Sequence, residues 1–473
     1  MATRYSNPSG DAGNWGATST WSATQGGSVG ASVPGTSDLA IVDSGDNVTL
    51  TGDVTVGSIK VDGTLTGGAN KITLDDGGDA KIANLDGTIS GDLDIEVNSG
   101  TGTNRILDLT STGTVRNLTI NSAGETFTLD ADTTISNDLT ITAGTLDTNS
   151  STNRGLTVTG HASITGTLTG NASAISLGSL TVASGGTYSA TTGVTTIDSE
   201  NGSGLAIDID GVFVHNSGTV TIVTEANTTA DLIPASGNNL NDLIINHNSC
   251  VIELKGATTI DGALTVKDGT LTTESSGDNL TVTGDVTVGA SGNLGRTAST
   301  GAWTFGSLTI ASGGTYIATS GTTTIKNEAS SYAFKNGGTF THNNGKIFVD
   351  FDTPNTGGST EVQSDDFYDF EVAMNATSSE CSMRDKSGNT ITIYGDLTVT
   401  KGEFNTQAVG DALTIHGLTN IGANGFFLND ADQSTDKVIH HGLITNLGTY
   451  KINDTTTVNM NGGIRQLGTL TIA

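Results

Sequence analysis

The feature that most constrains the fold of this chain is a long internal repeat. Residues 308–325, LTIASGGTYIATSGTTTI, match residues 180–197, LTVASGGTYSATTGVTTI, at all but four positions. Leu139, Leu264 and Leu397 open a second set of similar segments, at nearly the same spacing. The repeated blocks span about 125–133 residues, and self-similarity at such a fixed period is typical of solenoids, propellers and arrays.

Tyrosines mark the same period. Tyr188, Tyr316 and Tyr450 each follow a Gly-Thr pair, in step with the other repeated segments. The third copy is the most diverged. The repeat predicts an N-terminal cap or attachment segment, a first set of atypical rungs and three repeat blocks, at residues 1–46, 47–117, 118–242, 243–369 and 370–473.

The local pattern is that of short β-strands. In segments such as GLTVTGHASITGTL, residues 155–168, apolar residues alternate with Thr or Ser and are interrupted by Gly, Asn and Asp. Alternation places bulky residues such as Leu156 and Val158 on one face of a strand and threonines on the other. No window shows helical periodicity, so we expect an all-β chain with strands of three to five residues.

Shorter units within each block specify the architecture. Successive units begin at Leu118, Leu139, Leu156 and Leu180. A unit of about 17–24 residues with two or three short strands is one rung of a β-helix, whereas a propeller blade needs about 40 residues. The sequence therefore predicts a single-chain β-solenoid, or β-helix, of roughly twenty short rungs.

Composition supports a narrow interior. The chain of 473 residues has 65 Gly but only 12 Phe, 7 Tyr and 3 Trp. We expect stacked Leu, Ile and Val to fill the solenoid, with little room for aromatic rings. At the N-terminus, Trp15, Trp21 and Pro34 precede the first regular rungs and indicate a cap. At the other end, Leu470 and Ile472 keep the strand pattern, so we expect an uncapped end that further chain or another subunit covers.

Charge excludes two classes of partner. The 49 Asp and Glu residues outnumber the 19 Lys and Arg residues, which gives a formal net charge of −30. Such a chain repels nucleic acids and anionic membranes. No stretch approaches the ~20 apolar residues of a membrane span, and the N-terminus has no secretory signal pattern. We expect a solvated acidic exterior, with no nucleic-acid partner and no membrane insertion.

Several phrases carry a resemblance to a known group of proteins. The Trp/Gly/Pro opening, NVTLTGDVTVGSIKV, LTVASGGTY, GTFTHNNG and GTLTI resemble β-helical repeat proteins of bacteriophage virions (tail fibres, tailspikes, head appendages or decorations) and related bacterial surface passengers. The likeness covers nearly the whole chain, but its motifs describe rungs and not a site. Passengers are expected to carry an export signal and often a C-terminal translocator, and this sequence shows neither pattern, which favours a virion protein. The resemblance therefore implies a virion, or else an extracellular surface, as the location.

An acidic stretch is the best candidate for chemistry. The tailspikes that this sequence resembles often cleave host glycans. A glycosidase needs two carboxylates ~5 to 10 Å apart. Residues 346–375 carry acids beside aromatic residues: Asp350, Asp352, Asp365, Asp366, Asp369 and Glu371, with Phe367, Tyr368 and Phe370. Asp369 aligns with Asn117 and Asp242 at the start of a rung. The stretch is therefore better interpreted as a solvated loop.

Histidines and cysteines give no site. His215 and His342 occupy equivalent repeat positions, which indicates rung corners, and the neighbours His440 and His441 would face opposite sides of a strand. Cys250 and Cys381 should lie about 30 Å apart, without a disulfide. We expect no catalytic residue, no metal and no cofactor, and the sequence does not specify a ligand site. Calcium on surface aspartates stays an open alternative.

The sequence predicts a structural, rod-like component of an extracellular assembly, namely a phage virion appendage or a capsid decoration, and not an enzyme. Two alternatives stay open: a secreted bacterial adhesin or self-stacking surface filament subunit, and a tailspike-type glycan depolymerase. Expected partners are other virion or filament proteins, bound through the N-terminal cap and the C-terminal rung. Further possible partners are two other copies of the chain, in a homotrimer, and a host surface glycan.

Overall fold

The computed structural model describes residues 2–8, 12–75, 80–98, 105–110, 112–113, 115–223, 229–233, 237, 239–326, 332–351, 359–374, 376–386, 390–408, 412–429, 437–452 and 457–472. Over these residues the protein is all-β, with 1% helix, in the form of the 3-10 turn η1 (Thr18–Thr20). The prediction of a β-solenoid is confirmed. The chain forms two compact units, unit 1 with residues 1–226 and 230–239 and unit 2 with residues 227–229 and 240–473.

Unit 1 begins with strands that precede the regular turns. The N-terminal strand β1 (Thr3–Ser6) pairs antiparallel with β3 (Trp21–Ser22) and parallel with β4 (Leu39–Val42). Trp15 and Trp21 are fully buried there, with their ring centroids 4.9 Å apart in an edge-to-face contact. The other strands of this part are β2 (Ala12–Asn14), β5 (Asn47–Thr49), β6 (Val54–Val56), β7 (Ser58–Val61), β8 (Thr64–Thr66), β9 (Asn70–Leu74), β10 (Lys81–Leu85), β11 (Thr88–Ser90), β12 (Leu93–Val97) and β13 (Arg105–Asp108).

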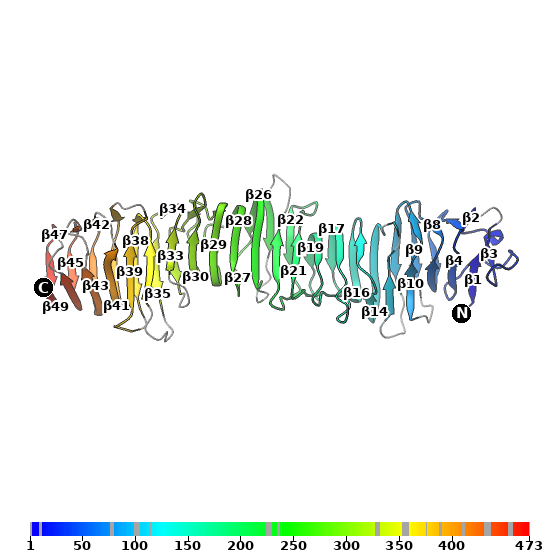
Figure 1. Ribbon diagram of the computed structural model, residues 1–473, viewed down its shortest axis with the longest axis horizontal. Helices are drawn as coiled ribbons and strands as arrows, with labels where there is room; N and C mark the ends of the chain where they lie inside the picture. The colour runs from blue at the N-terminus through cyan, green and yellow to red at the C-terminus, as the bar shows by residue number, and fades with distance from the viewer. Residues whose placement is uncertain are drawn as a thin grey trace. The chain divides into compact units, whose positions relative to one another are not determined.

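The regular turns of unit 1 consist of parallel strands stacked turn on turn (Figure 1). They are β14 (Asn117–Leu129), β15 (Thr133–Ile135), β16 (Leu139–Asp147), β17 (Leu156–Ile164), β18 (Thr167–Thr169), β19 (Ile175–Val182), β20 (Thr187–Ser189), β21 (Val194–Ile197), β22 (Leu205–Ile209), β23 (Val212–Val214), β24 (Thr219–Ile222) and β25 (Thr229–Ile233). They form three ladders, which run through Leu156, Ile175 and Thr195 (ladder 1), Ala162, Leu180 and Ile207 (ladder 2), and Leu168, Tyr188 and Phe213 (ladder 3).

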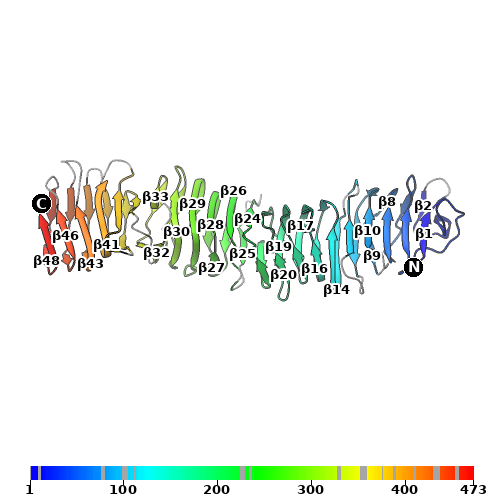
Figure 2. The same ribbon diagram turned by 60° about the horizontal axis from the view of Figure 1, so that its bottom comes forward.

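Unit 2 has the same construction (Figure 2). Its strands are β26 (Asp242–Leu254), β27 (Thr258–Ile260), β28 (Leu264–Thr273), β29 (Leu280–Leu294), β30 (Trp303–Ile310), β31 (Thr315–Ile317), β32 (Thr322–Ile325), β33 (Tyr332–Asn336), β34 (Thr339–Thr341), β35 (Lys346–Asp350), β36 (Ser359–Gln363), β37 (Asp366–Phe367), β38 (Asp369–Ala373), β39 (Glu380–Arg384), β40 (Ile391–Ile393), β41 (Leu397–Ala408), β42 (Ala412–Ile415), β43 (Thr419–Asn429), β44 (Lys437–His440), β45 (Ile444–Asn446), β46 (Thr449–Ile452), β47 (Thr457–Met460), β48 (Ile464–Gln466) and β49 (Thr469–Ile472).

Three ladders also build unit 2. They run through Leu280, Trp303 and Thr323 (ladder 1), Val286, Leu308 and Phe334 (ladder 2), and Leu294, Tyr316 and Phe340 (ladder 3). In both units most apolar residues of the strands point inward and most threonines outward, as in β17 and β30, although some threonines, such as Thr195 and Thr323, are buried. The predicted alternation is therefore confirmed, because parallel stacking keeps each side chain above its equivalent in the turn before.

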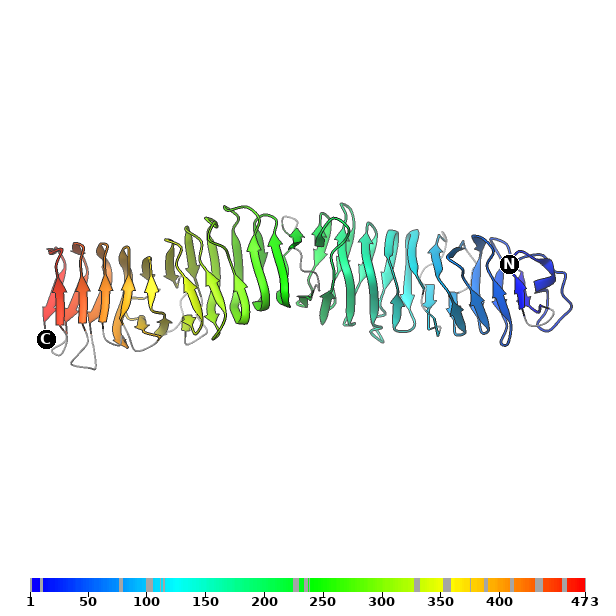
Figure 3. The same ribbon diagram turned by 90° about the horizontal axis from the view of Figure 1, so that it is seen from above.

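The turns are longer than expected. Over the described residues the solenoid has about 16 turns and not roughly twenty, because paired residues on neighbouring turns can lie far apart in sequence, as Leu180 and Ile207 do. Many strands also exceed the expected three to five residues. Strand β29 is 15 residues long and takes part in all three ladders, since its backbone stays extended through two corners of the turn. Seen from above, long strands of this kind bend from one ladder into the next (Figure 3).

Aromatic rings fill much of the unit 2 interior, so the expectation that the solenoid has little room for aromatic rings was wrong there. The buried rings include Trp303, Phe305, Tyr316, Phe334, Phe367, Phe370, Phe404, Phe427 and Tyr450. The narrow interior accepts them because flat rings can stack at the spacing of the turns, which is close to ~4.8 Å. Phe427 and Tyr450, on neighbouring turns, have centroids 4.8 Å apart and planes only 6° apart.

The long sequence repeat does not contain a whole number of turns. Leu264 lies in ladder 2, and five successive pairings in this ladder lead to Met383. The matching Leu397 comes two strands later and pairs with Phe370 in ladder 1. Tyr316 and Tyr450 show the same displacement, since Tyr316 lies in ladder 3 and Tyr450 in ladder 2. Equivalent residues of blocks 2 and 3 thus occupy different faces of unit 2.

Candidate functional site

The acidic stretch of unit 2 is divided between the interior and the surface. Phe367 and Phe370 are buried in the core and cannot form a platform for a ligand. Asp350 lies 3.4 Å from the Lys326 ammonium. These residues therefore serve the packing and charge balance of the solenoid.

Two further acids of this stretch stabilise neighbouring turns. Glu371 forms an ion pair of 2.7 Å with Lys346, which lies one turn earlier. Asp369 accepts a hydrogen bond of 2.7 Å from the backbone N–H of Asp396, which places it at a corner of the turn as its alignment suggested. Asp352 lies outside the described residues.

Asp366 has a different environment. Its neighbour Asp365 accepts a hydrogen bond of 3.0 Å from the backbone N–H of Lys386, whereas the Asp366 side chain is exposed and lines a cavity. Partial burial raises the pKa of Asp366, as does the charge of Asp365, while His342 opposes the change. Of the predicted acids that the structure describes, Asp366 is the one that lies with aromatic side chains in a cavity.

The aromatic neighbours of Asp366 belong to a row of rings along one corner of unit 2. We call this the ring row: His342, Tyr368, Tyr394, His416 and His441. Each residue of the row directly follows a strand. His342 follows β34 of ladder 3, and the other four follow the strands β37, β40, β42 and β44, in that order. Because β37, β40, β42 and β44 pair in register, the residues just after them reach the same corner on successive turns.

The rings of this row contact one another. The His342 centroid lies 5.6 Å from that of Tyr368 and 5.4 Å from that of Tyr394. Tyr394 stacks on His416 at 5.9 Å, and His416 on His441 at 4.9 Å, with planes only 7° apart in both pairs. Tyr394 is 49% exposed. An uninterrupted series of ring faces and edges is therefore available to solvent.

A cavity of about 470 Å³ opens at the first part of the ring row. Its lining residues are Phe340, Thr341, His342, Asn344, Asp366, Tyr368 and Tyr394. Three of these carry aromatic six-membered rings, one is a carboxylate, and none is a lysine or arginine. Flat apolar faces beside a single negative charge can hold a ligand group that is both apolar and positive.

His342 is fixed at this cavity by the local backbone. The Asn344 N–H donates a hydrogen bond of 3.1 Å to Nδ1 of His342, and both Asn343 and Asn344 adopt positive φ angles of 50° and 56°. Nδ1 as acceptor places the proton of a neutral imidazole on Nε2. Burial lowers the pKa of His342, against the charge of Asp366. A neutral His342 does not compensate the charge of the Asp366 carboxylate.

His215 forms the same kind of corner in unit 1. The Ser217 N–H donates a hydrogen bond of 2.9 Å to Nδ1 of His215, and Asn216 and Ser217 have positive φ angles of 48° and 60°. Asn216 also donates to the Ala190 carbonyl at 2.7 Å. The two corners agree with the interpretation of His215 and His342 as equivalent positions, although His342 additionally faces a cavity.

His440 and His441 point to opposite sides, as the strand geometry predicts. His440 is fully buried, with Nδ1 2.8 Å from the Thr419 hydroxyl and Nε2 3.0 Å from the Tyr450 hydroxyl. Burial lowers the pKa of His440 to about 4, so the imidazole is neutral at neutral pH. His441 instead belongs to the exposed ring row. Cys381 is a free, buried thiol, and burial raises its pKa. The side chain of Cys250 lies outside the described part.

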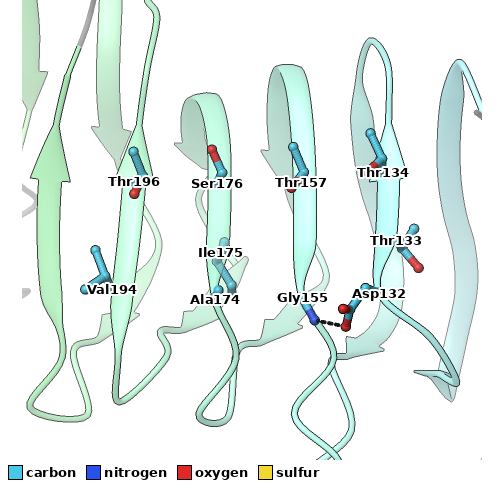
Figure 4. A pocket seen from close by; sticks show the side chains of 10 residues that line it. All are labelled: Asp132, Thr133, Thr134, Gly155, Thr157, Ala174, Ile175, Ser176, Val194 and Thr196. Atoms are coloured by element: carbon cyan, nitrogen blue, oxygen red, sulfur yellow. Dashed lines mark hydrogen bonds between the residues drawn. The ribbon is translucent and has the colours of Figure 1, made fainter.

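A second cavity, of about 330 Å³, lies on ladder 1 of unit 1 (Figure 4). Four hydroxyl side chains, Thr134, Thr157, Ser176 and Thr196, follow one another there on successive turns. At its edge, the Gly155 N–H donates a hydrogen bond of 2.8 Å to Asp132. Neutral hydroxyl groups and one carboxylate that is already paired make this cavity a weaker candidate than the one at the ring row.

The ring row was not predicted from the sequence. Tyr394 and His416 were not singled out, although each directly follows the last inward residue of a strand, Ile393 and Ile415. An aromatic residue or histidine at that position in successive turns is the signal that could have revealed the row. The described residues contain no cluster of three or more His, Cys, Asp or Glu side chains suited to a metal ion, and no helix among them could cross a membrane.

Comparisons with known proteins add no assignment. No family model, no curated protein and no solved structure matches this chain. Its description as a β-solenoid accordingly rests on its own strands, and any function on the chemistry of its surface.

Proposed function

We propose that the protein is a structural component of an extracellular assembly, in the form of a phage virion appendage or a capsid decoration. The observation that carries this proposal is the parallel pairing of strands in both units, which joins each turn to the next through backbone hydrogen bonds over an interdigitated core. Such a scaffold resists local opening, because each strand is held from both sides. Rigid display of surface is the task for which it is suited.

Ion pairs between neighbouring turns support the same proposal. Lys71 and Glu96 lie 2.6 Å apart and Arg384 and Glu361 3.0 Å apart, and each pair joins strands that are distant in sequence. Arg116 likewise contacts Asp94 at 2.6 Å. Several of the few basic residues thus stabilise the stacking, and the remaining acidic groups keep the exterior highly charged and solvated.

Limited proteolysis tests the structural part of this proposal. We expect trypsin to leave the folded protein largely intact, since its cleavage requires local unfolding of a strand held on both sides. The denatured chain, with its 19 Lys and Arg residues, serves as the control. Rapid cleavage of the folded protein at many sites would contradict the role of a rigid scaffold.

Electron microscopy with a labelled antibody tests the location. Label on capsids or tails of the native source would support the virion proposal, and label on cell-surface filaments would favour the alternative of an adhesin or filament subunit. Light scattering of the purified chain gives the oligomeric state, for which a trimer is the proposed form. We infer no enzymatic activity.

One observation keeps the glycan depolymerase as a second candidate, namely that Asp366 lies in a cavity beside Tyr368 and Tyr394. Its neighbour Asp365 is the nearest additional carboxylate in sequence, but it is engaged with the Lys386 backbone. Release of sugar from a bacterial capsule that is lost in Asp365→Asn and Asp366→Asn would establish this activity. The same assay without release would leave the structural role as the sole proposal.

A further inference from the structure

We propose that the cavity at the ring row binds a methylated ammonium group, with the tyrosine rings of unit 2 providing cation–π contacts and Asp366 the compensating charge. The relevant residues come from two neighbouring corners: His342 follows β34, and Asp366 and Tyr368 flank Phe367 of β37. Tyr394, after β40, adds a third turn. This site goes beyond the structural role proposed above and does not depend on it.

The shape of the site suits a rounded cation. Tyr368 and Tyr394 both contact His342, with centroids 5.6 and 5.4 Å from that of the imidazole, and Phe340 contributes to the cavity lining. Ring faces attract a cation within about 6 Å of the centroid, and the attraction is largest when the cation gives up little hydration. An ammonium that carries methyl groups is weakly hydrated, and its methyl groups can contact the ring faces directly.

The charge of the site favours the same ligand. Among the described lining residues Asp366 is the carboxylate and none is a lysine or arginine, and His342 is neutral near pH 7 because burial lowers its pKa. The net charge of −30 adds a long-range preference for cations. Unit 2 already contains one such contact, since the Lys335 ammonium lies 4.9 Å from the centroid of the Tyr332 ring.

The charge also distinguishes between sources of the methylated ammonium. A phosphocholine headgroup would bring a phosphate toward Asp365 and Asp366, which repel it. A trimethyllysine side chain on a basic peptide brings no anion. We therefore commit to a methylated lysine or a comparable cationic amine, and expect phosphocholine to bind more weakly than choline.

Calorimetry and ligand-observed NMR test the proposal on the full chain at about 0.15 M salt, where diffuse attraction is screened. Tetramethylammonium, choline and trimethyllysine should bind with dissociation constants on the order of 1 mM. The neutral carbon analogue of choline, 3,3-dimethylbutan-1-ol, should bind at least about fivefold more weakly. Equal binding of choline and this analogue would overturn the proposal, as would the absence of any cation binding.

Variants locate the site. Tyr394→Leu should weaken binding of trimethyllysine by about five- to tenfold, whereas Tyr394→Phe, which keeps the ring, should stay close to the parent protein. Asp366→Asn should weaken it by up to about fivefold. His441→Leu removes an exposed ring of the same row that does not line the cavity, so it should have no effect.

Two outcomes would contradict the proposal even if binding is seen. One is trimethyllysine affinity that is unchanged in both Tyr394→Leu and Asp366→Asn while circular dichroism shows intact folding. The other is binding of a neutral saccharide such as methyl glucoside in preference to tetramethylammonium, which would assign the cavity to glycans. Neither result would alter the proteolysis test of the structural role.

Discussion

Strands β19 of unit 1 and β30 of unit 2 occupy equivalent places in the repeat and have the same sequence of buried and partly exposed positions. Nevertheless, Ile175 and Leu177 of β19 correspond to Trp303 and Phe305 of β30, and all four side chains are buried. The comparison teaches that the backbone of this solenoid specifies which positions face inward, but not the volume of the side chains that fill them.

Glycines help to explain how both side chains fit. A Cβ atom on Gly170 would lie 2.9 Å from Cδ1 of Ile175, and one on Gly295 would lie 3.2 Å from the Trp303 ring. In each unit a glycine thus borders the variable side chain. In unit 2 the larger ring also packs against Tyr316, with centroids 6.2 Å apart. The interior therefore adjusts through neighbouring side chains rather than through the course of the strands.

The largest expected loss of stability comes from truncating Trp303, the bulkiest residue in this comparison of the two units. Trp303→Ala should lower the free energy of unfolding by about 3–5 kcal/mol, because neighbouring turns cannot collapse onto the cavity left by the indole. At the equivalent position of unit 1, the much smaller deletion Ile175→Val should lower the free energy of unfolding by only about 0.5–1.5 kcal/mol. Denaturant unfolding followed by circular dichroism measures both. Similar losses in the two variants would mean that the Trp303 site relaxes freely.

The next effect concerns the partners of the repeated tyrosines. The Tyr188 and Tyr316 hydroxyls contact threonines, whereas Tyr450 contacts His440. Since the folded pKa of His440 is about 4 and its ordinary value is 6.5, the unfolded chain binds the proton first as pH falls between these values. Acid should therefore destabilise the fold by up to about 3 kcal/mol through this group.

Comparison with His440→Thr isolates this contribution, because threonine is the partner of the other two tyrosines. Unfolding free energies at several pH values between about 7.5 and 4, measured for both proteins, should fall more steeply for the parent chain. Above about pH 7 the difference should not change with pH, because the unfolded histidine is then neutral as well. Parallel curves over the whole range would show that His440 takes up its proton without a change of stability.

The smallest effect should be the same in both units. Tyr188 and Tyr316 each have their hydroxyl 2.8 Å from a buried threonine hydroxyl, Thr195 and Thr323. Tyr188→Phe and Tyr316→Phe leave that hydroxyl without its partner, so each should cost about 1–2 kcal/mol. Thermal and denaturant unfolding give the two values. Losses that differ clearly would show that the aromatic core of unit 2 changes the strength of this contact.

The fold could be predicted from the sequence because alternation and repetition are local properties. Leu156 and Val158 alternate with threonines whatever lies on the neighbouring turns, so their inward direction was evident. The aromatic interior was missed because room for Trp303 depends on Gly295 and Tyr316, which are adjacent only after coiling. The number of turns was overestimated because the loops, which carry no periodic pattern, contribute much of the length of each turn.

The candidate site was accessible only in part. Asp366 and Tyr368 were identified together from the sequence, and the structure places both in the cavity. Tyr394 lies one turn after Tyr368 and reaches the same corner because β37 and β40 pair in register, with Phe367 opposite Ile393. Such a register depends on the length of the whole turn between them, which includes strands β38 and β39 and their connections. Chemistry that is spread over several turns is therefore hidden from a reading of single segments.

The repeat block of unit 2 holds five turns and two further strands, as the positions of Leu264 and Leu397 show. The second of two such blocks therefore begins on a different ladder from the first, as Leu264 in ladder 2 and Leu397 in ladder 1 show. Contacts within a copied block are copied with it, as the Tyr188–Thr195 and Tyr316–Thr323 contacts show, whereas Tyr450 of the third block contacts His440 instead. Equivalent residues of these blocks, such as Tyr316 and Tyr450, therefore face different sides of unit 2 instead of lining up along one side.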